Sequence, residues 1–327
     1  MVPLRLGLLS TARINDAIIG AAATSDSVEV VAVASRDADR AAAHAAERSI
    51  PRSHGSYEEL LADDGIDAVY VSTPNGLHAP WARKALEAGR HVLCEKPVDE
   101  EPDVVDGLFT LAAERGLVFT EAFMWRHLPQ TQALCDLVAQ GAVGELRMIR
   151  VWSGFVLERE GDPRLDPAQQ GGALMDIGCY CVSAVRLLAG EPDAVTAQAV
   201  RDASRPDGVD MRVAATLRFP GPVLAHFDCA FDLPMGFGLQ VVGSEAAIEV
   251  DDPWFGVEPG IRVRGADGTV EEIEVEHADP YRAQLEDLAG AIADGRRPLL
   301  DRAEVVGQAR SLQALLRAMS NDEEDVR

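Results

Sequence analysis

The sequence predicts an α/β protein with a doubly wound parallel sheet first and an α+β region with an open, mostly antiparallel sheet second. Two observations predict this fold class. Over about the first 120 residues, short apolar runs alternate with helical patterns, which is typical of parallel strands joined by right-handed crossovers. From about residue 123, strand-like segments follow one another directly, which is typical of antiparallel sheets.

The strands of the first region are apolar almost throughout, as expected for strands covered on both faces. In order, they are LRLGLL, VEVVAVAS, DAVYVS, HVLCE and LVFTEA. The helices that connect them are expected at 14–24, 38–48, 77–88 and 100–115. These elements form the parallel sheet and its two covering layers.

The second region begins with a helix near 129–139, a strand near 145–155 and a helix near 173–189. Strand-like segments joined by PG, DG and GS turns follow, and these turns favour antiparallel pairing. The segments are 194–202, 210–219, 222–231, 237–242, 246–250, 261–264 and 269–276. Two helices, 280–294 and 301–319, precede an acidic tail, NDEEDVR, that we expect to be frayed.

Domain organisation follows from the change of pattern, because the chain has no internal repeat and no Pro/Gly-rich linker. We expect a nucleotide-binding domain at 1–122 and a substrate-binding and oligomerisation domain at 123–327, which abut near 120–125. The C-terminal helix is free to pack back on the first domain. A cleft between two domains is the default ligand site.

Charge and composition exclude several partners. The chain has 54 acidic and 30 basic residues, a formal charge of -24, which repels phosphate backbones and anionic lipid surfaces. We therefore expect neither nucleic acid nor membrane partners. The opening MVPLRLGLLS lacks a basic n-region and a cleavage site, and no later run approaches ~18 uninterrupted apolar residues, which predicts a cytoplasmic protein.

The five cysteines are odd in number and lie mostly in apolar strings. This usage favours reduced, buried thiols. Cys179 and Cys181 form a Cys-x-Cys pair with no His or further Cys nearby, and such a pair seldom holds a metal ion. We expect no metal site.

The turn after the first strand is the candidate pyrophosphate site, because backbone N–H groups at a helix N-terminus bind phosphate. The glycine fingerprint wants Gly at 10, 12 and 15, where this chain has Ser, Ala and Asn. Small residues still permit close approach, and hydroxyls add donors. We expect the cofactor to contact Ser10, Thr11, Ala12, Arg13 and Ile14. A capped helix start without a ligand is the alternative.

The end of the second strand bears on cofactor choice. An NAD site wants an acidic residue there for the ribose hydroxyls. This chain has Ser35 and Arg36, which suit a 2'-phosphate and favour NADP. Asp37, one step later, keeps NAD as the alternative, and a solvated arginine is a third reading.

Two further strand ends supply the expected nicotinamide edge. The run VSTPNGLH places Thr73, Pro74, Asn75 and His78 after the third apolar strand, at the carboxyl edge where ligands bind in open α/β sheets. A capping Asn and a surface His are the alternative reading of this run.

The chain has only two lysines, Lys84 and Lys96, among its 30 basic residues. Lys84 lies in a helical stretch, where a solvated face explains it. Lys96 instead follows Glu95 at the end of an apolar run and precedes Pro97, which pushes it toward an extended conformation. An ammonium held there can donate to a substrate oxygen and stabilise a developing alkoxide.

The second domain contributes the run GGALMDIGCY. If a helix begins just after the glycines, Asp176 and Tyr180 are four residues apart and share one face. A lysine ammonium nearby would make the tyrosine hydroxyl an acid/base group. Ordinary packing is the alternative for both residues.

Together, STARIN, ASRD, VSTPNGLH, VLCEKP and GGALMDIGCY resemble the Gfo/Idh/MocA family of oxidoreductases. The resemblance implies an N-terminal Rossmann domain, an open-faced sheet that forms homodimers or homotetramers, and Lys96 as the catalytic lysine. It also implies that Tyr180 transfers the proton, with Asp176 beside it. The tyrosine form is similar to the branch of glucose-fructose oxidoreductase, D-xylose dehydrogenase, dihydrodiol dehydrogenase and 3-ketosugar reductase.

The expected function is NADP-dependent transfer of a hydride between nicotinamide and a hydroxyl or carbonyl carbon of a sugar or polyol. Trp125, Arg126 and Arg164 are expected to hold substrate hydroxyls, and Tyr281 to close the cofactor site. Three alternatives stay open: a non-catalytic regulator that senses NADP(H), a trans-dihydrodiol dehydrogenase, and a glycosidase that uses bound NAD transiently.

Overall fold

The computed structural model describes residues 2–158, 161–204 and 207–325. These residues form two compact units. The first unit comprises residues 1–124 and 279–306, and the second comprises 125–278 and 307–327. Each unit has its own sheet.

The sheet of the first unit has six parallel strands in the order β3-β2-β1-β4-β5-β6. The strands are β1 (Leu4–Leu9), β2 (Val28–Ala34), β3 (Arg52–His54), β4 (Ala68–Val71), β5 (His91–Glu95) and β6 (Phe119–Ala122). Strand order reverses between β1 and β4, and ligands bind at the carboxyl edge of such a reversal. The predicted parallel sheet is confirmed.

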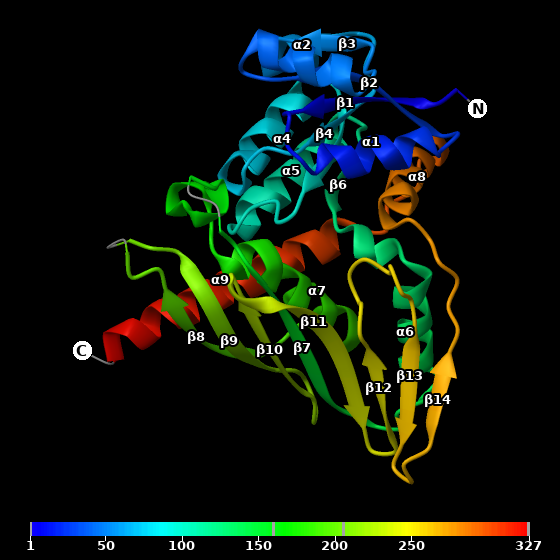
Figure 1. Ribbon diagram of the computed structural model, residues 1–327, viewed down its shortest axis with the longest axis vertical. Coiled ribbons are helices and arrows are strands. Elements are labelled where there is room, and N and C mark those ends of the chain that lie inside the picture. Colours follow the sequence, from blue (N-terminus) through cyan, green and yellow to red (C-terminus); the bar gives the residue numbers. More distant parts are fainter. Residues whose placement is uncertain (1, 159–160, 205–206, 326–327) are drawn as a thin grey trace. The chain divides into compact units, whose positions relative to one another are not determined.

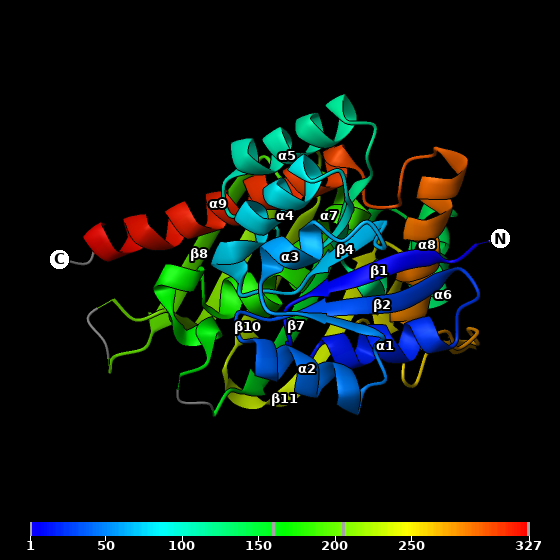
Figure 2. The same ribbon diagram turned by 90° about the horizontal axis from the view of Figure 1, so that it is seen from above.

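Helices cover both faces of this sheet. They are α1 (Asn15–Ala23), α2 (Ala38–Glu47), α3 (Tyr57–Leu61), α4 (His78–Glu87), α5 (Pro102–Glu114) and α8 (Pro280–Asp294). Figure 2 shows α4 and α5 on one face and α1 and α2 on the other. Helix α8 returns from the far end of the chain to lie beside α1 (Figures 1 and 2), where Leu285 and Leu288 join the core around Leu6 and Ile18.

Strand β3 and helix α3 were not predicted. Strand β3 has three residues, Arg-Ser-His, and lies at the edge of the sheet, so it lacks the apolar run by which buried strands are recognised. Helix α3 is a single short turn, begun by Ser56, whose hydroxyl accepts from the Glu59 N–H at 3.1 Å. Short edge elements leave little trace in hydrophobic periodicity.

The second unit contains an eight-stranded sheet in the order β14-β13-β12-β11-β7-β10-β9-β8. Its described pairings are antiparallel except that of β7 with β10, which is parallel. The strands are β7 (Leu146–Val156), β8 (Ala194–Arg201), β9 (Asp210–Arg218), β10 (Leu224–Ala230), β11 (Asp232–Gly243), β12 (Ala246–Val250), β13 (Ile261–Gly265) and β14 (Val270–Ile273). The mostly antiparallel prediction is confirmed.

The helices of the second unit are α6 (Pro129–Ala139), α7 (Cys179–Ala189) and α9 (Arg302–Asp325), of which α9 starts in the first unit. Burial alternates along β9: Val213, Ala215 and Leu217 are buried, whereas the side chains between them are exposed. One face of this sheet is therefore packed, and the other is open to solvent.

One prediction about helices was wrong in detail. Residues 174–178 form a π-helix (Leu174–Gly178) before α7 begins, instead of the first turn of an α-helix. A Cβ at Gly178 would lie 2.8 Å from Cys229 Sγ, so glycine lets this wider turn lie against β10. Helix α9 continues to Asp325, and the expected fraying of the acidic tail stays a prediction.

The five cysteines are free thiols, and all except Cys135 are buried. No group of three or more His, Cys, Asp or Glu side chains in the described part of the chain could hold a metal ion. One described segment, Pro167–Ala189, is long and apolar enough to cross a membrane. Because 67% of its most apolar stretch is buried inside the structure, it has the character of a core helix.

Candidate active site

The turn between β1 and α1 is held by side chains instead of glycines. Ser10, whose φ is 146°, keeps its hydroxyl inside the protein: Oγ accepts from the Ala12 N–H at 3.1 Å and lies 2.8 Å from both Ser72 O and Ser72 Oγ. Asn15 is fully buried, donates to Ser10 O at 2.7 Å and accepts from Ser72 Oγ at 2.8 Å. This network explains why the chain departs from the glycine fingerprint at positions 10 and 15.

The backbone of the same turn presents unsatisfied donors. Helix α1 has no side-chain cap, and within the described residues no partner accepts from the N–H groups of Thr11, Arg13 or Ile14. The Arg13 side chain is exposed, and Ile14 packs against the core. Free N–H groups at a helix start form an anion site, which fits a pyrophosphate.

The carboxyl end of β2 gathers two arginines. Buried Ser35 accepts from Arg40 Nε at 3.0 Å, so its hydroxyl orients that guanidinium. The pKa of Tyr57 is raised by burial, and positive charge on Arg36 and Arg40 opposes this rise. The charges of both guanidinium groups therefore reach the Tyr57 hydroxyl. Sequence reasoning missed Arg40, although its position in the first turn of the following helix was a usable signal.

Asp37, the residue that would favour NAD, is already engaged. Its carboxylate caps α2 by accepting from the Arg40 N–H at 2.9 Å, and its own N–H donates to Ser35 Oγ at 3.3 Å. An N-capping carboxylate is stabilised by the helix start. This edge therefore presents positive charge more than an acceptor for ribose hydroxyls.

Thr73, Pro74, Asn75 and His78 follow β4, as predicted. The Thr73 hydroxyl is buried, and no described residue is its hydrogen-bond partner. Buried polar atoms normally have partners, so this hydroxyl fits contact with a bound ligand. Pro74 and Asn75 are half-buried and lead into a short 3-10 turn, Asn75–Leu77.

His78 lies inside the protein, not at the surface. It is 1% exposed, with Nδ1 2.9 Å from Pro97 O and Nε2 2.7 Å from Thr73 O. Burial lowers the pKa of His78 to about 4, the two carbonyls oppose that shift, and the Lys96 charge adds to it. At neutral pH the ring is uncharged, so it has one N–H and donates to one of these two carbonyls.

Lys96 follows β5 in a braced loop, and its peptide bond with Pro97 is cis. Besides His78, buried Glu121 of β6 holds this loop by accepting from the Val98 N–H at 3.1 Å. Glu95 accepts from Tyr70 Oη at 2.5 Å and from the Lys96 N–H at 3.2 Å. The backbone that carries the Lys96 ammonium is thus fixed from three sides.

Tyr281, at the start of α8, lies close enough to Glu95 and Lys96 for their charges to affect its pKa. Burial raises its pKa to about 12; negative charge on Glu95 adds to the rise, and positive charge on Lys96 opposes it. Asp279 caps α8 by accepting from the Tyr281 N–H at 2.9 Å. The phenol therefore stays protonated at neutral pH and lies in the field of the Glu95–Lys96 pair.

In the second unit, Arg164 is committed to protein partners. It binds Asp162 through Nε and Nη2, each at 2.9 Å, and Nη1 lies 3.3 Å from Asp176 Oδ2. Its guanidinium also lies 5.6 Å from the Phe155 ring centre. Arg164 therefore contacts the Asp176 carboxylate, and its expected contact with substrate stays a prediction.

A buried tryptophan ring lies beside Tyr180. The Trp254 ring contacts the Tyr180 ring edge-on at 5.4 Å and the Trp125 ring at 5.2 Å. Both tryptophans are buried, and neither indole N–H has a hydrogen-bond partner among the described residues. Arg126 lies beside Trp125 and donates to Ser183 Oγ at 3.3 Å. No sequence signal pointed to Trp254, which lies in a loop far from the recognised motifs.

Comparison with known proteins agrees with this arrangement. Residues 5–123 match an oxidoreductase family with an NAD-binding Rossmann fold, and residues 131–249 match the GFO/IDH/MocA C-terminal domain. D-xylose 1-dehydrogenase (NADP(+)) 2 of Haloferax volcanii is 38% identical over 94% of this chain and 95% of its own length. Human trans-1,2-dihydrobenzene-1,2-diol dehydrogenase is 36% identical over 69% and 67%, respectively.

Solved structures show the same likeness. A 3-ketoreductase from Actinomadura kijaniata, solved with NADP and TDP-benzene, superposes with a TM-score of 0.92 at 29% identity, covering 97% of this chain and 98% of the other. The aldose-aldose oxidoreductase of Caulobacter crescentus gives a TM-score of 0.90 at 26% identity. Both sheets and both halves of the chain are matched. The chain therefore belongs to the GFO/IDH/MocA family of oxidoreductases.

Proposed function

We propose that this protein is an NADP-dependent dehydrogenase or reductase that acts on a hydroxyl or carbonyl carbon of a sugar or polyol. The observation that carries the proposal is the braced Lys96 loop at the carboxyl edge of the parallel sheet, whose backbone is held by Glu95, Glu121 and His78. The named activities of the xylose dehydrogenase and 3-ketoreductase relatives support it.

The same edge has groups that fit the cofactor. The N–H groups of Thr11, Arg13 and Ile14 would hold the pyrophosphate, and Ser10 and Ala12 let it approach. The guanidinium groups of Arg36 and Arg40 would hold a 2'-phosphate, which such charged donors bind strongly. Asp37 is occupied as a helix cap, which supports NADP over NAD.

The proposed chemistry assigns one task to each residue. When bound, the nicotinamide supplies or accepts a hydride at the reacting carbon. Lys96 donates from its ammonium to the reacting oxygen and stabilises negative charge there. Tyr180 gives or takes the hydroxyl proton, and Asp176, oriented by Arg164, orients the reacting group. Trp125 and Arg126 contribute substrate contacts.

A trans-dihydrodiol is the second candidate substrate. The Trp254 ring stands edge-on to Tyr180, and the Trp125 ring stands edge-on to Trp254; aromatic rings of this kind suit a flat, partly apolar substrate ring. The dihydrodiol dehydrogenase relative supports this candidate. A sugar would instead use the free indole N–H groups as hydroxyl partners.

The test is turnover of a substrate panel, followed by NADPH absorbance. Aldoses, ketosugars, polyols and trans-dihydrodiols are offered with NADP and with NAD, and the reverse reactions with NADPH. Lys96→Met should lower kcat by ~10³-fold or more while nucleotide affinity stays within a few fold. Lys84→Met is the matched control. Lys84 lies on the surface of α4 and pairs with Glu58, so this variant should leave kcat unchanged.

Other outcomes separate the alternatives. Nucleotide binding without turnover of any compound would favour an NADP(H)-sensing regulator. Cleavage of a glycoside with retained cofactor and no net NADPH would indicate a glycosidase. Near-normal kcat for Lys96→Met would overturn the assignment of the catalytic lysine.

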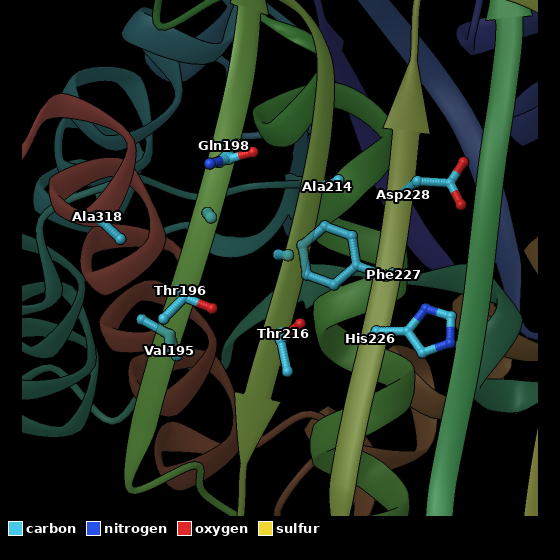
Figure 3. Close-up of a pocket in the computed structure, with 11 residues that line it drawn as sticks. Val195, Thr196, Gln198, Ala214, Thr216, His226, Phe227, Asp228 and Ala318 are labelled. Carbon is cyan, nitrogen blue, oxygen red and sulfur yellow. The ribbon is translucent and has the colours of Figure 1, made fainter. Parts of the chain in front are cut away.

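We also propose a homodimer or homotetramer formed through the open face of the second unit's sheet. This face carries exposed Trp152 and Leu224, and a hollow of about 610 Å³ lies along β8, β9 and β10. Figure 3 shows Gln198, Thr216, His226 and Asp228 around this hollow. Sedimentation equilibrium tests the proposal, and a monomer at micromolar concentration would contradict it.

A cytoplasmic location, without nucleic acid or membrane partners, completes the proposal. Four buried free thiols suit a reducing compartment, and the net charge of -24 disfavours anionic polymers and lipids. Cell fractionation and a nucleic acid binding assay would test these statements.

A further inference from the structure

The buried carboxylate of Asp210 accepts a hydrogen bond at the start of the helical segment that carries Asp176 and Tyr180. Asp210, the first residue of β9, is 3% exposed. Its Oδ2 accepts from the Leu174 N–H at 2.7 Å, and the Ala173 N–H also stabilises its charged form. The carboxylate therefore satisfies backbone donors at a helix start that has no cap from its own sequence.

The glycine pair before this helix makes room for the carboxylate. Gly172 has a φ of +118°, and a Cβ there would lie 2.2 Å from Asp210 Oδ1. A Cβ at Gly171 would lie 2.5 Å from Arg164 O. Only glycine permits both approaches. The glycines thus serve contact between the turn, Asp210 and the Arg164 backbone.

The first turn of this segment is not an ordinary α-helical turn. It is a π-helix, Leu174–Gly178. Such turns are rare in proteins, and those that occur often lie at functional sites. The Asp176 N–H donates to Gly172 O at 3.1 Å, and the Asp176 carboxylate is held by Arg164. Asp210 holds the backbone two residues before Asp176, so the two anchors act on opposite ends of one short segment.

At neutral pH the Asp210 carboxyl is mostly ionised. Burial raises its pKa to about 6, while the Leu174 and Ala173 N–H groups and Arg201 of β8 oppose the rise. Burial raises the pKa of the Cys229 thiol of β10 well above its usual value, and the charge of Asp210 adds to this rise. An ionised acceptor at a helix N-terminus is favoured by the helix dipole.

We propose that Asp210 is a positioning residue, which fixes the first turn of the Asp176–Tyr180 segment and thereby sets the orientation of both groups toward the reacting oxygen. This inference rests on the proposed function. It predicts that loss of the Asp210 carboxylate damages turnover far more than nucleotide binding, which is assigned to the first unit.

The experiment compares Asp210→Ala, Asp210→Asn and Val213→Ala in the full-length protein. Val213 is a buried apolar residue of the same strand, so Val213→Ala controls for loss of packing in β9. The readouts are kcat and KM for the best panel substrate, NADPH affinity, the melting temperature, and hydrogen exchange at the Leu174 amide.

Asp210→Ala should lower kcat by ~10–100-fold, because a displacement of about 1 Å costs that much. Asp210→Asn keeps an acceptor and should lose only ~3–10-fold, since it lacks the charge. NADPH affinity should stay within ~2-fold, and Leu174 exchange should accelerate in Asp210→Ala alone. Val213→Ala should lower the melting temperature and leave kcat within ~2-fold.

Two results would overturn the inference. One is near-normal kcat in a folded Asp210→Ala protein. The other is an equal loss of kcat in Val213→Ala at a matched melting temperature. If the wild-type protein turns over no panel substrate, the proposed function itself fails. The Leu174 exchange rate then decides the capping role, and unchanged exchange in Asp210→Ala would overturn that as well.

Discussion

Two turns lead into helices at the functional regions of this protein, and they are built in opposite ways. After β1, Ser10 and Asn15 bind backbone of their own turn and reach Ser72 at the end of β4. Before α7, Gly171 and Gly172 have no side chains, so the carboxylate of Asp210, which lies 36 residues beyond Leu174, can bind the helix start. One helix start is thus held by polar side chains of its own turn. The other is held by a distant carboxylate that the glycines allow to approach.

We expect substitutions in these two turns to have independent effects on nucleotide affinity and on the chemical step. If the first region is built by its own contacts, changes at its nucleotide edge should alter nucleotide affinity and leave the chemical step intact. Changes at the glycine turn should do the reverse, as the Asp210 variants test.

The largest effect expected at the first region is on cofactor choice. Arg36→Ala and Arg40→Ala should each weaken NADP binding by ~10–100-fold, because each removes charge-assisted hydrogen bonds worth ~1.5–3 kcal/mol. NAD affinity should change by no more than a few fold. Calorimetric titration with both nucleotides measures this.

Arg48→Ala is the control for these variants. Arg48 ends α2 and pairs with Asp16 and Glu47, so its loss removes a positive charge without touching the end of β2. Equal losses of NAD and NADP affinity in the Arg36 and Arg40 variants would show that the 2'-phosphate site is misassigned.

An effect of at most similar size should appear in the pH dependence of stability, where the two regions have opposite signs. His78, in the first unit, has its pKa lowered to about 4 from 6.5. Its neutral form is favoured by folding, so its contribution is full above 6.5 and is lost as pH falls toward 4. Asp210, in the second unit, has its pKa raised to about 6 from 3.8. Its protonated form is favoured, so stability is lost as pH rises from 3.8 to 6.

Each contribution is ~3 kcal/mol at most. Urea unfolding of the wild type, His78→Gln and Asp210→Asn between pH 4 and 7 measures both. The disadvantage of His78→Gln should shrink on acidification, whereas Asp210→Asn should gain on the wild type as pH rises. If the stability of both variants relative to the wild type changed in the same direction with pH, the assigned pKa shifts of His78 and Asp210 would be contradicted.

The sequence predicts the first region better than the second, for a physical reason. Uninterrupted apolar runs identify parallel strands, and parallel strands bring their carboxyl ends to one edge. The residues after β1, β2, β4 and β5 were therefore predicted as a group. Arg40 was missed because it lies on the following helix, and His78 was placed correctly along the chain but its burial was not foreseen.

The second region depends on contacts that periodicity does not encode. The alternation of apolar residues predicts its strands, and the motif GGALMDIGCY predicts a helix. The π-helix, the Asp210 cap and the Trp254 ring all arise from segments distant in sequence. Arg164 shows the same limit, because its partners Asp162 and Asp176 became apparent only in three dimensions.

The central claim is that Lys96 and Tyr180 serve one chemical step. It is tested most directly by kcat/KM of Lys96→Met, Tyr180→Phe and the double variant, with NADPH affinity measured in parallel. Residues that act as a unit give strongly non-additive losses. We predict that the double variant falls within ~10-fold of the worse single variant; losses that multiply, as for independent residues, would contradict the claim.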